Sequence, residues 1–223
     1  MVVTEIAFIR FKSASPEPLE NLAAGLAVQN EWHAKTYPHL PSSFPGSICF
    51  QRVDEPTEIL ITARWESVAA HWNWIKSEEN VKVMDTLGKY ISQEHKDDLT
   101  LLHVGGDHFG EPPAESLGEM VPLLDSPIIS IDRMMVDGGK KVAFAREVDR
   151  LQDSLRALAV PHMVRGSWRQ DTESDEKHEY VVVGGWQPLG GHTEVVRPPR
   201  FVQFEVIRPL ATTWTTRHYR RLL

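Results

Sequence analysis

Polar and apolar residues alternate along several short stretches of this chain, which is typical of β-strands with one buried face. The first such stretch, residues 4–12, sends one set of side chains to each face: Glu5, Ala7, Ile9 and Phe11 against Ile6, Phe8 and Arg10. Similar patterns predict strands at 48–53, 58–65, 99–104, 127–136, 166–170, 179–186 and 212–219. The sequence therefore indicates antiparallel sheets built from short strands.

Two longer stretches place apolar residues three and four positions apart, as helices that cover a sheet do. The first begins near Pro16 and has an apolar stripe of Leu19, Leu22, Leu26 and Tyr37. Gln29, Asn30 and His33 fall on the same stripe, where polar groups either pair internally or line a cavity. The second helix, 140–160, has a stripe without polar residues: Phe144, Val148, Leu151, Leu155 and Leu158.

Each of these helices is followed by a hairpin and then by a further helical segment. Ser67 is the expected N-cap of a helix that runs to about Ser92, with an interruption at Ser77–Glu79. The matching segment after His192 contains two prolines, Pro198 and Pro199, so we expect a shortened or irregular helix there. A charged hairpin tip is expected at 173–177.

The segments RWESVAAH (64–71) and GWQPLGGH (185–192) show that this order of elements occurs twice. Both place a tryptophan six residues before a histidine, and a glutamate precedes each tryptophan by seven residues. Such registered matches indicate a duplication. We expect a first domain at 1–106, a Gly-, Pro- and acid-rich linker at 107–125 and a second domain at 126–223. The predicted fold class is α+β, with two tandem domains that each have the order strand, helix, strand, strand, helix, strand.

Composition narrows the functional classes. With 41% hydrophobic and 25% charged residues, and no apolar run of membrane-spanning length, the chain is expected to be a soluble protein without a membrane partner. A formal charge of −7 argues against nucleic acid as a partner. The N-terminus does not resemble a signal peptide and Cys49 is the single cysteine, which favours a cytoplasmic location.

The motif W-x-S followed by A-x-H, at 65–71, resembles the dimeric α+β barrel superfamily, which includes antibiotic-biosynthesis-type monooxygenases, polyketide cyclases and haem-degrading enzymes. The resemblance implies two tandem ferredoxin-like domains that form an intramolecular dimeric α+β barrel. His71 matches the histidine of the monooxygenase-type pattern, whereas Asn80 stands where several cyclase-like relatives have a histidine. Trp74 matches a tryptophan of the haem-degrading relatives. Their iron-ligating histidine would fall at Met84, which argues against haem degradation.

These residues lead to a first hypothesis, an enzyme of secondary metabolism that uses no cofactor and no metal. His71 or His33 would remove a proton from an aromatic or polyketide-like small molecule, before oxygenation or before cyclisation or isomerisation. Further residues are expected to bind the substrate: Gln29, Asn30, Asn80, Trp65, Trp72 and Trp74. A plain packing role remains open for both histidines. The sequence lacks the motifs G-x-S-x-G, G-x-x-x-x-G-K, G-x-G-x-x-G and H-E-x-x-H.

Two alternatives and one open question accompany this hypothesis. The chain could be a non-catalytic barrel that carries an apolar ligand, or, third in order, a haem-binding protein. Because a fused pair of domains makes the usual dimer internal, we expect a monomer with an internal pseudo-dimer or a homodimer that pairs through exposed strand edges. The polar stripe of the first long helix and the apolar stripe of its counterpart predict that the working cleft lies in the first domain.

Overall fold

The structure, a computed structural model, describes residues 1–40, 46–112, 120–172, 175–187 and 206–222. The chain divides into two compact units, of which the first comprises Met1–Asp107 with Arg221–Leu223 and the second His108–Arg220. His192, Pro198 and Pro199 lie outside the described residues, as do part of the expected linker, 113–119, and part of the charged hairpin tip, 173–174.

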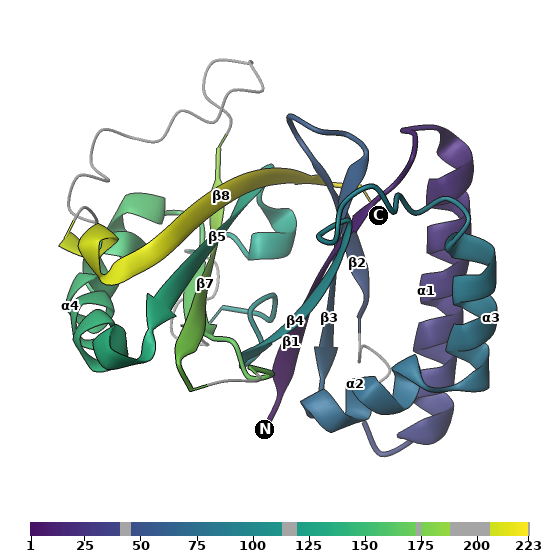
Figure 1. Cartoon of the computed structure of the whole chain (residues 1–223), viewed down its shortest axis with the longest axis horizontal. Helices are drawn as coiled ribbons and strands as arrows, with labels where there is room; N and C mark the ends of the chain where they lie inside the picture. Colours follow the sequence, from purple (N-terminus) through teal and green to yellow (C-terminus); the bar gives the residue numbers. More distant parts are fainter. Residues whose placement is uncertain (41–45, 113–119, 173–174, 188–205, 223) are drawn as a thin grey trace. The chain divides into compact units, whose positions relative to one another are not determined.

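The first unit is an antiparallel four-stranded sheet with helices on one face (Figure 1). In chain order its elements are β1 (Val3–Arg10), α1 (Pro16–Thr36), β2 (Ile48–Arg52), β3 (Glu58–Trp65), α2 (Val68–Ile75), α3 (Glu78–Leu87) and β4 (Leu99–Gly105). The strand order β4-β1-β3-β2 gives β1 a neighbour on each side. Ala7 and Ile9 of β1 pack against Leu22 and Leu26 of α1, so the core lies between the sheet and its helices.

The predicted start and interruption of the helical segment after β3 are confirmed. The Ser67 side chain accepts a hydrogen bond from the Ala70 amide at the start of α2, and Ser77 caps α3 in the same way. The predicted end near Ser92 is wrong, because α3 stops at Leu87. Gly88 follows, and Ile91 then forms an isolated antiparallel bridge with Phe11, so the chain there has joined the sheet.

The second unit has the strand order β8-β5-β7-β6, again antiparallel, with α4 packed on one face (Figure 1). Its elements are η2 (Leu123–Asp125), β5 (Ile128–Asp137), η3 (Gly138–Lys140), α4 (Lys141–Ala159), β6 (Val164–Trp168), β7 (Lys177–Trp186), η5 (Arg208–Leu210) and β8 (Ala211–Arg221). Phe144, Val148 and Leu151 are buried, and Leu155 packs beside them. The Leu158 side chain lies outside the described residues.

Matching ionic clusters show how closely the two units correspond. Glu58 is buried at the start of β3 and accepts hydrogen bonds from Arg10 and Arg52. Glu179 is buried near the start of β7 and binds two arginines, Arg133 and Arg169, in the same way. Arg52 and Arg169 each also pair with the aspartate two residues later. The glutamates found by their equal spacing from Trp65 and Trp186 therefore hold equivalent positions in the two sheets.

The chain is thus an α+β protein with antiparallel sheets, as predicted. In the part of the chain that the structure describes, no helix combines the length and the apolar character that a membrane crossing requires. Cys49 is fully buried on β2, and burial raises the pKa of its thiol to about 12. A thiol held in its neutral form is a poor nucleophile, so we assign Cys49 to packing.

Candidate active site

A cavity of about 260 Å³ lies between the sheet of the first unit and its three helices. Its walls are mostly apolar, and its polar side chains are Glu5, Gln29, His71 and Asn80. The helices that cover it approach each other closely, because a Cβ at Gly25 of α1 would lie only 2.7 Å from Val83 Cγ1 of α3. An apolar cavity with a few converging polar groups is the usual form of a small-molecule site.

Glu5 is the only carboxylic acid among the residues that line this cavity. It lies on the helix-facing side of β1, two residues before Ala7, and is 4% exposed. The indole Nε1 of Trp65 donates a hydrogen bond of 2.8 Å to its Oε2. Burial raises the pKa of Glu5 to about 7, although the Trp65 hydrogen bond opposes this rise. A carboxyl group with this pKa can both accept and release a proton near neutral pH.

His71 is buried beside Glu5 and is positioned from several sides. It lies in the first turn of α2, and its ring stacks on Trp65 with 4.5 Å between ring centroids and 10° between planes. Its Nε2 is 3.4 Å from Glu5 Oε2, and its Nδ1 is 2.7 Å from Nε2 of His103. Because the face of an indole attracts a cation, this stack suits an imidazole that gains a proton.

His103 completes a series of three titratable side chains. It is fully buried on β4, directly opposite Glu5 in the register of β1 and β4. A proton on Glu5 can pass to His71 Nε2, because the Nδ1 of His71 can then donate a hydrogen bond to His103 Nε2. The arrangement can therefore take a proton from a bound molecule at Glu5 and retain it within the protein.

Three amide side chains predicted to bind substrate lie at or near the cavity. Gln29 lines it and donates a 2.9 Å hydrogen bond to Ser47 Oγ, which in turn hydrogen-bonds Asn30. Asn30 is not among the lining residues. Asn80 lines the cavity and uses one N–H to bind the Ile75 carbonyl at the end of α2. Gln29 and Asn80 are thus held in position to meet polar atoms of a ligand.

His33, the second candidate base, lies outside the residues that line the cavity. It is 1% exposed, and its Nε2 is 3.2 Å from Oε2 of Glu66. Its ring also lies 5.5 Å from that of Trp65, on which His71 stacks. His33 therefore packs against Trp65, which in turn contacts Glu5 and His71.

The three candidate tryptophans have different environments. Trp74 is buried and lines the cavity. Trp65 is fully buried and acts through Glu5 and His71, which it contacts directly. Trp72 is 41% exposed and is not among the lining residues. Among the three, Trp74 is the one that can contact a bound ring.

The Trp65 hydrogen bond can be tested by replacing Trp65 with phenylalanine. Because this bond favours the ionised carboxylate, we expect the Trp65→Phe variant to raise the pKa of Glu5 from about 7 by roughly one further unit. A carbon-13 NMR titration of the glutamate carboxyl groups would measure the change. Trp186→Phe makes the same change in the second unit and should leave Glu5 unaltered. An unchanged or lower pKa in Trp65→Phe would contradict the assigned role.

Sequence reasoning identified neither Glu5 nor His103 as a site residue. The signal for Glu5 was present, because it shares a strand face with three apolar residues: Ala7, Ile9 and Phe11. An acid on the buried face of a strand needs a partner or a function. No comparable signal identified His103, since its position opposite Glu5 depends on the pairing of β1 with β4. Among the described residues, no group of three or more metal-ligating side chains could hold a metal ion.

The second unit contains a counterpart of this site in which the acid has been replaced. The equivalent strand position on β5 is Ser130, because Ile128 pairs with Trp186 as Val3 pairs with Trp65. Trp186 Nε1 donates a 2.9 Å hydrogen bond to Ser130 Oγ, as Trp65 does to Glu5. His218 on β8 lies opposite Ser130, as His103 lies opposite Glu5. The arrangement is repeated with a serine at the position of Glu5, and the Ser130 hydroxyl donates a 3.2 Å hydrogen bond to Asp132, two residues further along β5.

Comparison with known proteins supports the fold. No family model matches the chain, and no curated protein matches its sequence. An anthrone oxidase-like protein has a similar structure, with a TM-score of 0.59, 12% identity and coverage of 100% of this chain and 92% of the other. A proposed monooxygenase of Fusobacterium nucleatum subsp. nucleatum is similar with a TM-score of 0.58 and 10% identity. The match covers 100% of this chain and 93% of the other. A chlorite dismutase variant of Candidatus Nitrospira defluvii is similar with a TM-score of 0.56 and 11% identity, and the match covers 100% of this chain and 92% of the other.

These likenesses show that the fold is that of the ferredoxin-like dimeric α+β barrel proteins, as the sequence resemblance implied. At such low identity they show the fold alone. The sequence resemblance includes haem-degrading enzymes, so the fit of that group to the cavity matters. His71 is the only histidine that lines the cavity, and its two ring nitrogens face Glu5 and His103. These residues do not fit an iron ligand, and we assign no step to haem.

Proposed function

We propose that this protein is a monooxygenase-type enzyme that activates a small aromatic substrate by removing a proton, without a prosthetic group. The single observation that carries the proposal is Glu5, a buried carboxyl group with a pKa of about 7 at the wall of an apolar cavity. A general base works best when its pKa lies near the operating pH. The name of the anthrone oxidase-like neighbour agrees with an aromatic substrate.

In this proposal the Glu5 carboxylate removes a proton from an acidic C–H or O–H group of the substrate. His71 and His103 then share the proton, while Gln29 or Asn80 donates a hydrogen bond to the oxygen that carries the negative charge. For a methylene substrate such as an anthrone, the carbanion transfers electrons to O2, a C–O bond forms, and the peroxide takes back the proton from the protein to become a hydroperoxide. Loss of water from the hydroperoxide leaves a ketone, so one oxygen atom enters the product and the other leaves as water.

The same base could instead start a cyclisation or isomerisation, in which the proton returns to a different atom and no O2 is consumed. A non-catalytic carrier of apolar ligands would also use this cavity. These alternatives differ in two measurable properties, oxygen uptake and dependence on pH. The raised pKa of Glu5 favours a catalytic role, because a carrier has no need of a titratable group at the cavity wall.

The proposal can be tested with anthrone as the substrate in an oxygen electrode. We expect uptake above the spontaneous rate, one O2 per anthrone, with an enzymatic rate that rises as the pH increases through about 7 because Glu5 ionises. Anthrone oxidises spontaneously in base, so the rate without protein is subtracted at each pH. Turnover to a cyclised or isomerised product without uptake would favour the second chemistry. Binding that is flat with pH, without turnover, would favour the carrier.

A further inference from the structure

A second pocket, of about 330 Å³, adjoins the cavity of the first unit. Two residues, Met84 of α3 and Leu99 of β4, line both spaces. Leu99 is 49% exposed although it lines the inner cavity. Met84 and Leu99 therefore form the boundary between the two spaces, the opening, and the second pocket lies on its outer side.

The inner cavity is long, and Glu5 lies at the end away from this opening. Glu5, Ala7 and Ile9 of β1 all line it, and four residues of a strand span about 13 Å at a rise of ~3.3 Å per residue. Ile9 pairs with Leu99 in the register of β1 and β4, whereas Glu5 pairs with His103. A compact cavity of about 260 Å³ would be shorter than this distance. The space therefore suits an elongated molecule that enters past Leu99 and reaches Glu5 with one end.

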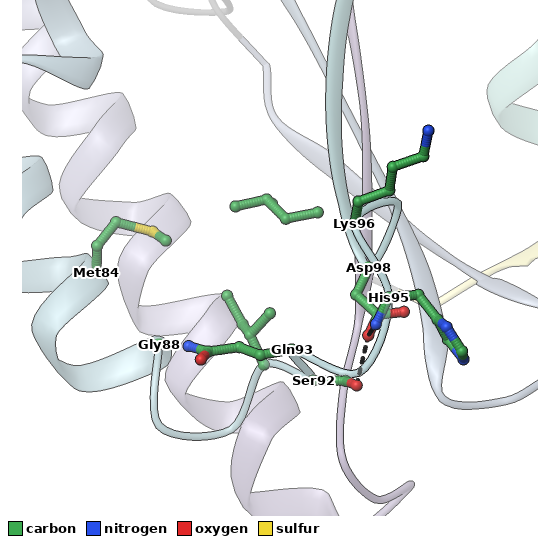
Figure 2. A pocket seen from close by; sticks show the side chains of 9 residues that line it. Met84, Gly88, Ser92, Gln93, His95, Lys96 and Asp98 are labelled. Atoms are coloured by element: carbon green, nitrogen blue, oxygen red, sulfur yellow. Dashed lines mark hydrogen bonds between the residues drawn. The ribbon is translucent and has the colours of Figure 1, made fainter.

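The outer pocket has an apolar side and a polar rim. Met84, Ile91 and Leu99 supply its apolar surface. Figure 2 shows Met84 directed into the space, whereas Lys96 extends away from it. The pocket is therefore suited to an apolar group and has no lysine directed at an anion.

The loop that forms the rim is held by contacts with the carboxylate of Asp98. Ser92 Oγ donates a 2.6 Å hydrogen bond to Asp98 Oδ2, drawn as a dashed line in Figure 2, and the His95 amide donates to the same oxygen. Arg10 Nε lies 3.1 Å from the other oxygen of Asp98. Met84, with its flexible unbranched side chain, is the residue at the opening that can adapt to a ligand.

We propose that the substrate is an aromatic molecule with an apolar arm, and that Met84 and Leu99 determine which arms are accepted. The acidic ring would lie at Glu5 and Trp74, and the arm would pass between Met84 and Leu99 into the outer pocket. This inference rests on the proposed function, because that function places the reacting end at Glu5. The class of substrate is thus an alkyl- or polyketide-substituted phenol or anthrone rather than a bare ring.

A series of 4-alkylphenols, from 4-methylphenol to 4-octylphenol, tests the arm by isothermal titration calorimetry. For the wild-type protein we expect the affinity to rise about fourfold for each added methylene group until the arm fills the pocket. In Met84→Trp the indole fills the opening, so the affinity should stop rising with chain length, and 4-octylphenol should bind no more than about fourfold more tightly than 4-methylphenol. Leu99→Trp, at a half-exposed position, should give the same pattern and serves as a second variant if Met84→Trp folds poorly.

Asp85→Trp is the matched control, because it places the same indole on the exposed side of α3 and should leave the series unchanged. The proposed arm site is overturned if the affinity of the wild-type protein does not change with chain length. It is also overturned if the affinity rises as steeply in Met84→Trp and Leu99→Trp as in wild type. Repeating the series with Glu5→Gln separates the two proposals, since the dependence on chain length should persist while oxygen uptake is lost. If Glu5→Gln retained oxygen uptake, the proposed function would be refuted. The dependence of affinity on chain length would still test the arm site independently.

Discussion

Replacing Glu5 with glutamine should lower anthrone-dependent oxygen uptake by about 10²–10⁴-fold, the usual contribution of a positioned general base. Glutamine keeps the size of the side chain and an oxygen that can accept the hydrogen bond of Trp65, but it cannot take a proton. We therefore expect the turnover number to fall while the affinity for 4-methylphenol changes little. Steady-state oxygen uptake at pH 8 and calorimetric binding to the same protein preparation measure the two quantities.

Glu66→Gln is the matched control for this prediction. Glu66 also pairs with a buried histidine, His33, but neither residue lines the cavity. The same chemical change there should therefore leave uptake within a few-fold of wild type. The opposite result, in which Glu66→Gln abolishes uptake and Glu5→Gln preserves it, would transfer the role of base to His33.

The stability of the protein should also depend on Glu5, with a sign that follows from its raised pKa. The carboxyl group binds its proton more tightly in the folded protein, with a pKa of about 7, than in the unfolded chain, where 4.5 is the ordinary value. Its contribution to the free energy of unfolding is therefore fully present below pH 4.5 and is lost as the pH rises through 7. The loss amounts to about 3 kcal/mol between these limits.

Glu5→Gln removes this dependence, so the variant should become more stable relative to wild type by about 3 kcal/mol between pH 4.5 and pH 8. Urea unfolding followed by tryptophan fluorescence at several pH values measures this difference, in which titrations common to both proteins cancel. Ser130→Ala, at the matching strand position of the second unit, removes no titratable group and should differ from wild type by the same amount at every pH. A pH-independent difference for Glu5→Gln would show that burial does not raise the pKa of Glu5.

The fold could be predicted because its main signals are local. A strand with one buried face repeats its pattern every two residues, and β3 indeed runs from Glu58 to Trp65, as its alternation predicted. Ser67 and Ser77 are short polar caps that mark helix starts wherever they occur. The end of α3 was predicted five residues too late, because the bridge between Ile91 and Phe11 joins residues that are far apart in sequence.

The site was only partly predictable for the same reason. His71 and Gln29 were identified because a motif or a helical stripe carried them, and both line the cavity. Glu5 and His103 are 98 residues apart in the chain, yet they face each other across two strands. Glu5 can be noticed as an acid on a buried strand face, but His103 does not stand out until the pairing of β1 with β4 is known. In the sequence alone, Glu5 and His103 are an acid and a histidine in two separate strands.

The hydroxyl of Ser130, in the position that Glu5 occupies in the other unit, has a consequence for how the chain evolved. If the two units descend from one ancestral copy, the ancestral strand needed only one base, and duplication freed the second copy from keeping it. A serine in that place accepts the tryptophan hydrogen bond without the cost of burying a charge. Selection could then favour stability in one copy and reactivity in the other. In this view the second unit keeps the tryptophan hydrogen bond, and the first unit keeps the carboxyl group as well.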